Sequence, residues 1–356
     1  MKPYEHGGNV YTAGIYNPAV VDFSANINPL GISKAVEKAI IDNINNLVHY
    51  PDPSGIKLKQ VISVNYSVRP EQIILGNGAA ELLYLYFHSK RPESVLIPVP
   101  SFSEYERAAR AAGCHVEYLY LDRTQQFNLD IDMLLERLPD YDVVIVGNPN
   151  NPTGGLLDRT DIISVLEVAK QNNTCVIMDE SFLDFLPDGQ CYSVMELTDN
   201  YKGLFVIRSM TKFYAIPGLR LGFGIGHQRL VNSLEMGKDP WNVNLLAQAA
   251  GVAALEDKEY RERSRELVGK CIEEMYGALK NIRQLSVYPP SVNFILTSVE
   301  KTGLTSGAFT EKMAERGYLV RDCGNYPGLD EYHVRLAVRQ TRENLELIQT
   351  IKNVLG

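Results

Sequence analysis

Short apolar runs alternate with amphipathic stretches through the middle of the chain. The amphipathic stretches, such as Ser103–Ala112 and Asp158–Gln171, carry apolar residues at helical spacing. Buried runs that alternate with helices are typical of a mostly parallel sheet covered by helices on both faces. The runs that we expect to form its strands are Gln72–Leu75, Ser94–Pro98, Asp142–Val146, Thr174–Met178, Gly203–Ile207 and Leu221–Ile225.

The pattern changes after about Trp241. A long helical region, Asn244–Lys280, is followed by alternating strand-like and helical segments. These are Val292–Leu296, Ser306–Arg316, His333–Val338 and a closing helix from Thr341. The sequence therefore predicts an α/β protein with a large domain over 31–243 and a smaller α+β domain over 244–356. Residues 1–30 are expected to pack against the active site or the small domain.

Composition and charge argue against several functions. Lys and Arg total 35 against 43 Asp and Glu, a formal charge of −8 without a basic tract, so nucleic-acid binding is not expected. No apolar run approaches the ~20 residues of a membrane span, and the first residues lack the apolar core of a secretory signal. The five cysteines lie far apart, which argues against a disulfide framework or a clustered metal site. We therefore expect a cytoplasmic protein without a metal.

A Gly-Asn-Gly turn, Gly76–Gly78, connects a predicted strand to a helix that begins at Ala79. Free backbone N–H groups at a helix N-terminus bind anions, and glycine lets a phosphate approach the backbone. The turn is neither a dinucleotide GxGxxG motif nor a Walker loop. Taken alone, it is also compatible with an ordinary strand-to-helix connection.

Polar residues follow two more predicted strands. Asn148–Gly154 reads Asn-Pro-Asn-Asn-Pro-Thr-Gly, and Asp179–Glu180 ends the next strand along the chain. Ligands of open α/β sheets bind at the carboxyl ends of strands, where an Asn can donate to a ring oxygen. A buried Asp costs desolvation unless it is paired, and one use is to keep a heterocyclic nitrogen protonated. A tight turn and a loop carboxylate are the alternative interpretations.

Lys212 follows a further predicted strand, in Ser209-Met-Thr-Lys, eight residues before Arg220. Most lysines lie on the surface. A lysine that is desolvated near another cation has a lowered pKa, however, and can form a Schiff base.

Together and in this order, the motifs resemble the fold-type-I, pyridoxal-phosphate-dependent aminotransferase superfamily, in its histidinol-phosphate aminotransferase branch, over essentially the whole chain. The resemblance implies pyridoxal 5′-phosphate as cofactor, bound covalently by Lys212 with Asp179 at its pyridinium nitrogen. Phe102 would stack on the ring and Asn151 would bind the ring hydroxyl oxygen. The residues implied around the phosphate are Gly78, Ala79, Ser209, Arg220 and Tyr50.

Two positions carry further implications of this resemblance. Tyr50, in His-Tyr-Pro-Asp, matches a tyrosine that reaches the phosphate of the neighbouring subunit, which implies a homodimer. Phe182 stands where the family usually has a tyrosine three residues after the pyridine Asp. The missing hydroxyl is expected to alter the pKa of the bound cofactor.

Arg335 and Arg339 lie in the predicted strand His333–Val338 and just after it. A spacing of four on a strand puts two residues on the same face, and guanidinium groups bind carboxylate and phosphate. From spacing alone, one functional and one surface arginine is equally expected. The resemblance makes Arg335 the residue that holds the substrate α-carboxylate, whereas a second arginine at 339 is outside the usual aminotransferase pattern.

Three other segments, His6–Asn9, Asp22–Gly31 and Asn325–Asp330, are similar to L-threonine-O-3-phosphate decarboxylases of the cobamide (vitamin B12) pathway. The implied reaction converts L-threonine O-3-phosphate to (R)-1-amino-2-propanol O-2-phosphate and CO2. A histidinol-phosphate aminotransferase stays open as an alternative. A decarboxylase of L-serine O-phosphate also stays open, because one methyl group changes binding by only ~1–3 kcal/mol. The residues implied to bind substrate are His6, Gly7, Asn26, Asn151, Arg335 and Arg339.

Overall fold

The computed structural model describes residues 6–8, 10 and 20–356. Its larger sheet has seven strands in the order β2-β8-β7-β6-β5-β3-β4. Neighbouring strands are parallel except at β8, which is antiparallel to β2 and to β7. The expected mostly parallel sheet is therefore confirmed. Its strands are β2 (Ile73–Gly76), β3 (Ser94–Val99), β4 (His115–Tyr120), β5 (Val143–Gly147), β6 (Cys175–Asp179), β7 (Leu204–Ser209) and β8 (Gly222–Gly226).

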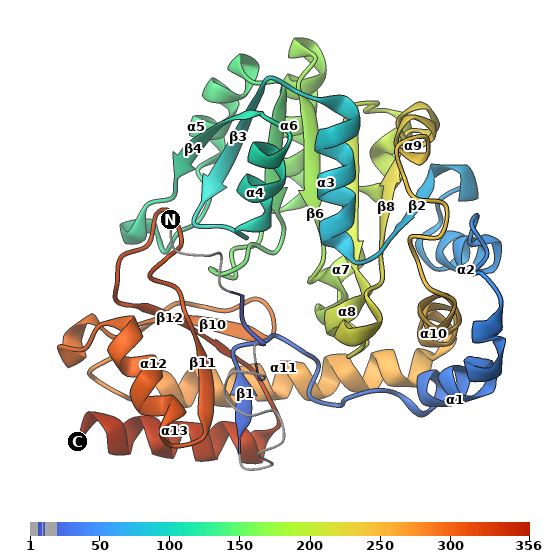
Figure 1. Cartoon of the computed structure of the whole chain (residues 1–356). Helices are drawn as coiled ribbons and strands as arrows, with labels where there is room; N and C mark the ends of the chain where they lie inside the picture. Colours follow the sequence, from blue (N-terminus) through green and yellow to red (C-terminus); the bar gives the residue numbers. More distant parts are fainter. Residues whose placement is uncertain (1–5, 9, 11–19) are drawn as a thin grey trace.

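Successive residues of the central strands face opposite sides of this sheet. Val144 and Val146 pack in one apolar cluster with residues of α6 (Arg159–Asn172). Val143 and Ile145 pack in a second cluster with residues of α3 and α4. The continuous apolar runs in the sequence therefore reflect burial on both faces. The other helices before residue 240 are α1 (Lys34–Asn43), α2 (Ile56–Tyr66), α3 (Ala79–Lys90), α4 (Glu104–Ala111), α5 (Ile131–Arg137), α7 (Gly189–Tyr192), α8 (Met210–Phe213) and α9 (Gln228–Glu235) (Figure 1).

A second sheet of five strands has the order β1-β11-β12-β10-β9 (Figure 1). The N-terminal strand β1 pairs in parallel with β11, so residues before 30 join the sheet that is otherwise formed by the end of the chain. The strands are β1 (Val21–Phe23), β9 (Ser286–Val287), β10 (Phe294–Ser298), β11 (Tyr318–Asp322) and β12 (His333–Ala337). Residues 1–5, 9 and 11–19 of the predicted N-terminal segment lie outside the described residues, and the domain boundaries stay a prediction.

The long helical region predicted over Asn244–Lys280 is two helices, α10 (Leu245–Glu256) and α11 (Lys258–Lys280). Asp257 lies between them, and its side chain accepts a hydrogen bond from the backbone N–H of Tyr260. An Asp at this position caps a new helix, which is why the chain begins α11 there. The later helices are α12 (Ser306–Ala314) and α13 (Thr341–Leu355).

Strands β2, β3, β5, β6 and β7 all run in the same direction, so their carboxyl ends meet at one edge of the large sheet. In an open α/β sheet this edge is where a ligand binds. No helix in the described part of the chain is long and apolar enough to cross a membrane. The residues that follow these strand ends are Gly78, Phe102, Asn151, Asp179 and Lys212.

Candidate active site

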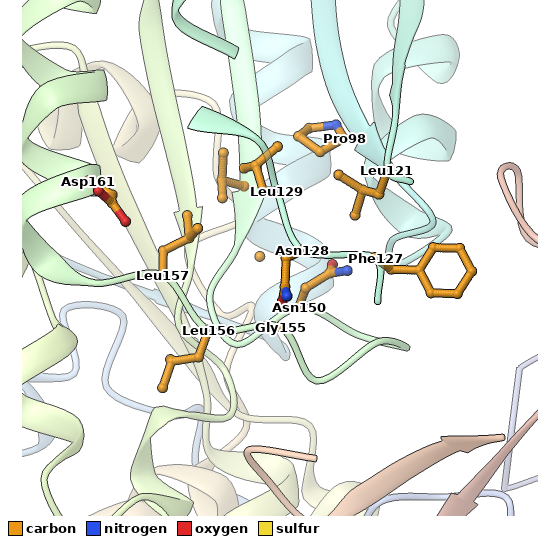
Figure 2. Close-up of a pocket in the computed structure, with 12 residues that line it drawn as sticks. Pro98, Leu121, Phe127, Asn128, Leu129, Asn150, Gly155, Leu156, Leu157 and Asp161 are labelled. Carbon is orange, nitrogen blue, oxygen red and sulfur yellow. The ribbon is translucent and has the colours of Figure 1, made fainter. Parts of the chain in front are cut away.

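A pocket of about 200 Å³ opens beside the turn that follows β5 (Figure 2). Asn150, Gly155 and Leu157 line it together with apolar residues of β3 and of the segment after β4, such as Pro98 and Leu121. None of the predicted cofactor or substrate residues is among the residues that line it.

The turn between β2 and α3 forms a close-fitting cradle with Arg220. A Cβ atom at Gly78, whose φ is +81°, would lie 2.2 Å from Arg220 Nη2. A Cβ atom at Gly222 would lie 2.5 Å from the backbone nitrogen of Ala79. Only glycine fits at both positions, so the N-terminus of α3 and the guanidinium lie close enough to share one phosphate.

Lys212 lies in α8, directly after β7. Its Nζ donates to Thr211 Oγ1 at 2.8 Å, and that oxygen lies 2.7 Å from Ser209 Oγ. Burial lowers the pKa of Lys212, as do the charges of Arg220 and Arg335, and the carboxylate of Asp179 acts in the opposite direction; the resulting pKa is about 8. A larger fraction of this amine is therefore neutral at neutral pH than of an ordinary lysine, which favours a nucleophilic role.

Asp179 ends β6 and is 8% exposed. Tyr105 donates its hydroxyl to Oδ2 at 2.7 Å, and the Ser181 N–H donates to Oδ1 at 3.0 Å. Burial raises the pKa of Asp179, and these hydrogen bonds oppose the rise. Each carboxylate oxygen can accept about two hydrogen bonds, so Asp179 retains capacity for a ring N–H. Sequence reasoning missed Tyr105, although it comes only three residues after Phe102.

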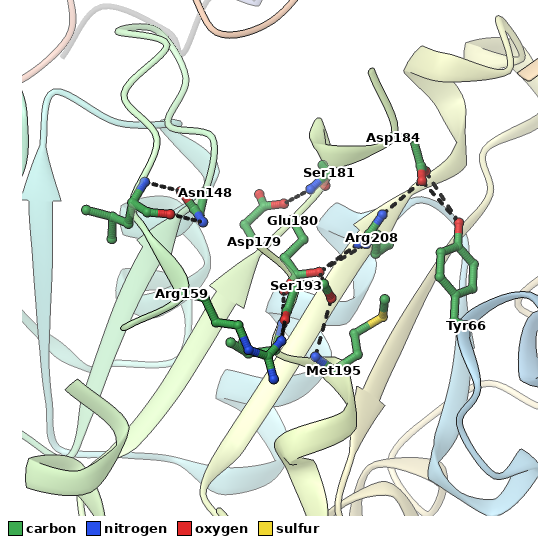
Figure 3. Close-up of polar contacts among 12 residues, drawn as sticks. Tyr66, Asn148, Arg159, Asp179, Glu180, Ser181, Asp184, Ser193, Met195 and Arg208 are labelled. Atoms are coloured by element: carbon green, nitrogen blue, oxygen red, sulfur yellow. Dashed lines mark hydrogen bonds and ion pairs between the residues drawn. The ribbon is translucent and has the colours of Figure 1, made fainter. Parts of the chain in front are cut away.

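A buried ionic network lies next to Asp179 (Figure 3). The Arg208 guanidinium is 2% exposed, contacts Glu180 Oε2 at 2.8 Å and contacts Asp184 Oδ1 at 2.9 Å. Glu180 also accepts from Ser193 Oγ at 2.7 Å and from the Val194 N–H at 2.9 Å. Since Glu180 follows Asp179 and Arg208 precedes Ser209, the network fixes the ends of β6 and β7.

Arg335 links the cofactor side of the site to the small sheet. It is 5% exposed and donates to Asn151 Oδ1 and, at 2.7 Å, to the Ser24 carbonyl. Its Nε is buried without a hydrogen-bond partner. Phe294 lies below the guanidinium, 5.6 Å from its carbon to the ring centroid, and packs in turn on Phe182. The structure thus brings the predicted residues Asn151 and Arg335 together, and the Arg335 Nε–H is the one buried donor of this guanidinium without a hydrogen-bond partner among the described residues.

Arg321 is a site residue that sequence reasoning missed. It lies directly opposite Arg335 in the β11–β12 register and is also 5% exposed. Its Nη2 donates to Asn325 Oδ1 at 3.1 Å, and its guanidinium lies over the Tyr326 ring. Neither arginine forms an ion pair with a carboxylate among the described residues. Two buried guanidiniums on one face are arranged to receive anions.

The expected strand-face position of Arg339 is wrong. β12 ends at Ala337, so Arg339 follows the strand rather than extending its face. Its guanidinium donates to Glu343 Oε1 at 3.0 and 2.8 Å and to the Asp22 carbonyl at 3.3 Å. The charge of Arg339 is therefore already balanced by a carboxylate of α13.

The remaining predicted residues lie in different surroundings. His6 Nε2 lies 2.9 Å from Glu104 Oε1, and its ring centroid is 6.0 Å from that of Phe102. Asn26 is buried, and its Oδ1 has no hydrogen-bond partner. Tyr50 is 77% exposed and stacks on Trp241 with ring centroids 4.6 Å apart, so it projects from this chain.

Comparison with known proteins agrees with this arrangement. The profile of the family described as aminotransferase class I and II matches residues 18–351. The chain belongs to this family. Threonine-phosphate decarboxylases and histidinol-phosphate aminotransferases are among the proteins similar to it.

Two relatives in this family are decarboxylases by name. A putative threonine-phosphate decarboxylase of Caldanaerobacter subterraneus subsp. tengcongensis is 40% identical over 99% of this chain and 95% of that protein. The threonine-phosphate decarboxylase of Salmonella typhimurium is 36% identical over 98% and 96%. The crystal structure of a histidinol-phosphate aminotransferase from Clostridium acetobutylicum has a TM-score of 0.87 and 34% identity, covering 94% of this chain and 98% of that one.

Pyridoxal phosphate is the cofactor of these aminotransferase class I and II enzymes, and the residues here fit it. The N-terminus of α3 and the Arg220 guanidinium lie close together, and both can donate to a phosphate. The buried Asp179 can pair with a ring N–H, and Lys212 supplies an amine with a lowered pKa. The assignment of each residue to a cofactor atom stays a prediction.

In protein freed of cofactor, we expect acetylation of Lys212 to reach half its maximal rate near pH 8 rather than near the ordinary lysine value of ~10.4. Replacing Arg220 by Gln removes a cation and should move the midpoint up, whereas Asp179→Asn removes an anion and should move it down. Competitive acetylation read by mass spectrometry measures all three. A wild-type midpoint near pH 10 would contradict the burial of this amine.

Arg208→Met should cost ~3–5 kcal/mol of unfolding free energy, because it leaves two carboxylates buried without their cation. Burial holds the pKa of Glu180 above its ordinary value, so protonation at acid pH removes the charge and the deficit should shrink as pH falls. Urea unfolding at pH 7.5 and 5 measures this. The control Arg69→Met, which breaks an exposed pair with Asp199, should cost under ~1 kcal/mol.

Proposed function

We propose that this chain is a pyridoxal-phosphate-dependent decarboxylase of L-threonine O-3-phosphate, acting in cobamide synthesis. The observation that carries the proposal is the pair of buried guanidiniums, Arg321 and Arg335, opposite each other and without carboxylate partners. A substrate with a carboxylate and a phosphate supplies two anions for them. The relatives named threonine-phosphate decarboxylase, similar over nearly their whole length, support the same substrate.

Each side chain of the candidate site has a separate role in the proposed reaction. Arg335 and Arg321 hold the two anionic ends of the substrate and so fix which bond at its Cα faces the cofactor. Pyridoxal phosphate, when bound, accepts the electron pair left on Cα as CO2 departs. Asp179 keeps a proton on the ring nitrogen. Lys212, with a pKa of about 8, can take up a proton and return it to Cα, or leave this to a bound water.

Product analysis tests the proposed function. Purified holoenzyme is incubated with phosphothreonine, phosphoserine, or histidinol phosphate plus 2-oxoglutarate. We expect CO2 and 1-amino-2-propanol O-2-phosphate from phosphothreonine without any keto acid. Glutamate formed from histidinol phosphate, with no CO2 from either phosphoamino acid, would refute the decarboxylase. CO2 from phosphoserine at an equal rate would widen the substrate to both.

Arg321→Gln should lower kcat/KM for phosphothreonine roughly ten- to a hundredfold, because a hydrogen bond to a charged group is worth ~1.5–3 kcal/mol. Arg339→Gln should lower it less, since its guanidinium is already paired with Glu343. Steady-state CO2 release compares the two variants. A larger loss for Arg339→Gln would restore residue 339 as the phosphate ligand and overturn the choice of Arg321.

We also propose a homodimer. Around Tyr50 the surface of the single chain is apolar: Ile44, Val48 and Trp241 are 53%, 82% and 48% exposed. Exposed apolar patches of this kind mark interfaces. Val48→Glu should therefore shift the protein toward monomers and reduce activity, as measured by sedimentation velocity. A wild type that is fully active as a monomer would disprove the dimer.

A cytoplasmic location is likewise inferred. All five cysteines are free thiols, which is typical of a reducing compartment. Cell fractionation of the native host tests this, and recovery of the protein outside the cytoplasmic fraction would refute it.

A further inference from the structure

Glu104, in the first turn of α4, is a buried carboxylate next to the candidate site, 7% exposed. Oε1 lies 2.9 Å from His6 Nε2, and Oε2 accepts from the Tyr84 hydroxyl at 3.1 Å. Arg107 Nη1 lies 3.5 Å from Oε1. Burying a carboxylate is costly unless it is paired, and here one partner is a residue predicted to bind substrate.

The contact determines which nitrogen of His6 is available. Burial alone would raise the pKa of Glu104, but the hydrogen bond and charge of His6, with Tyr84 and Arg107, outweigh it and hold that pKa below its ordinary value. The carboxylate is thus ionised at neutral pH and can only accept. His6 Nε2 therefore carries a proton, and Nδ1 is the nitrogen left for a ligand.

The ability of the His6 ring to bind an anion through Nδ1 depends on whether the ring is neutral or charged. In a neutral imidazole protonated at Nε2, Nδ1 carries a lone pair that faces an anion unfavourably. In the imidazolium both nitrogens donate, one to Glu104 and one to the ligand. A carboxylate at 2.9 Å balances this positive charge in a partly buried place.

Gly7 and Gly8, which follow His6, lie against Ser24. The Gly8 N–H donates to Ser24 Oγ at 2.7 Å, and a Cβ atom at Gly7 would lie 2.0 Å from the Ser24 carbonyl oxygen. That carbonyl also accepts from Arg335 Nη2. His6 is thus held between α4 and the residue that bonds Arg335.

We propose that Glu104 is a positioning residue, which holds the His6 ring beside Phe102 through Nε2, with Nδ1 available to the substrate's phosphate. The inference rests on the proposed function only in requiring a phosphorylated substrate. Glu104 itself does not touch the substrate, since both of its oxygens are already bonded.

Binding of inorganic phosphate to the holoenzyme, measured by calorimetry, tests the proposal, because positioning and simple repulsion predict opposite changes in phosphate affinity for Glu104→Gln. If Glu104 positions and charges His6, Glu104→Gln and His6→Ala should each weaken phosphate binding about tenfold, and the double variant should be no weaker than either. If the carboxylate merely repels anions, Glu104→Gln should bind phosphate more tightly, which would overturn the proposal. The proposal would also be overturned if the loss of phosphate affinity in the double variant equalled the product of the two single losses.

Kinetics separate positioning from a general structural role. Glu104→Gln should raise KM for phosphothreonine about tenfold with a smaller change in kcat, and Glu104→Asp should recover part of the loss. The matched control is Glu106→Gln on the same helix, which pairs with Arg110 at 2.6 Å and should leave KM unchanged. Equal effects of the two Gln variants would refute the proposal, as would an unchanged KM in Glu104→Gln.

The two proposals fail in different ways. A wild-type holoenzyme that releases no CO2 from phosphothreonine refutes the proposed function, yet the phosphate titrations still decide whether Glu104 acts through His6. The role of Glu104 alone is refuted if the wild type decarboxylates phosphothreonine and the Glu104→Gln variant binds phosphate and substrate normally.

Discussion

One buried cation holds together the strand ends on which the candidate site depends. Arg208, at the end of β7, is bonded to Glu180 and Asp184, which follow β6. Asp179 and Ser209 are the chain neighbours of these ionic residues, so their backbone positions are set by the network. The attraction within a buried ion pair is largely offset by desolvation. The network therefore contributes little net stability, and its main effect is to allow only one arrangement of the two strand ends.

The two halves of the site come from different sheets. The large sheet contributes the glycine cradle, Asp179 and Lys212, all at strand ends. The small sheet contributes the paired arginines on β11 and β12. Arg335 joins the halves, because it donates both to Asn151 of the large sheet and to the Ser24 carbonyl next to β1. Arg335, predicted to bind substrate, and Asn151, predicted to bind the cofactor ring, are thus joined by one hydrogen bond.

The structure places Asp179 and Lys212, predicted for the cofactor side, at neighbouring strand ends, and the sequence could predict these positions because an apolar run, which is a local signal, precedes each of them. The substrate side depends on contacts that are distant along the chain. Glu104 meets His6 across 98 positions, and Arg321 meets Arg335 only through pairing of β11, whose short apolar run, Tyr318–Val320, is only partly buried. The error at Arg339 came from applying the two-residue period of a strand to a residue that lies beyond the end of the strand.

The facing arginines make folding and ligand binding interdependent. Like charges directly opposite each other destabilise an antiparallel pair, and here both are also removed from water. An anion between them removes this penalty only in the folded state, so it stabilises the protein by mass action. The melting temperature of this enzyme should accordingly depend on the buffer, being higher in phosphate than in an uncharged amine buffer of equal ionic strength.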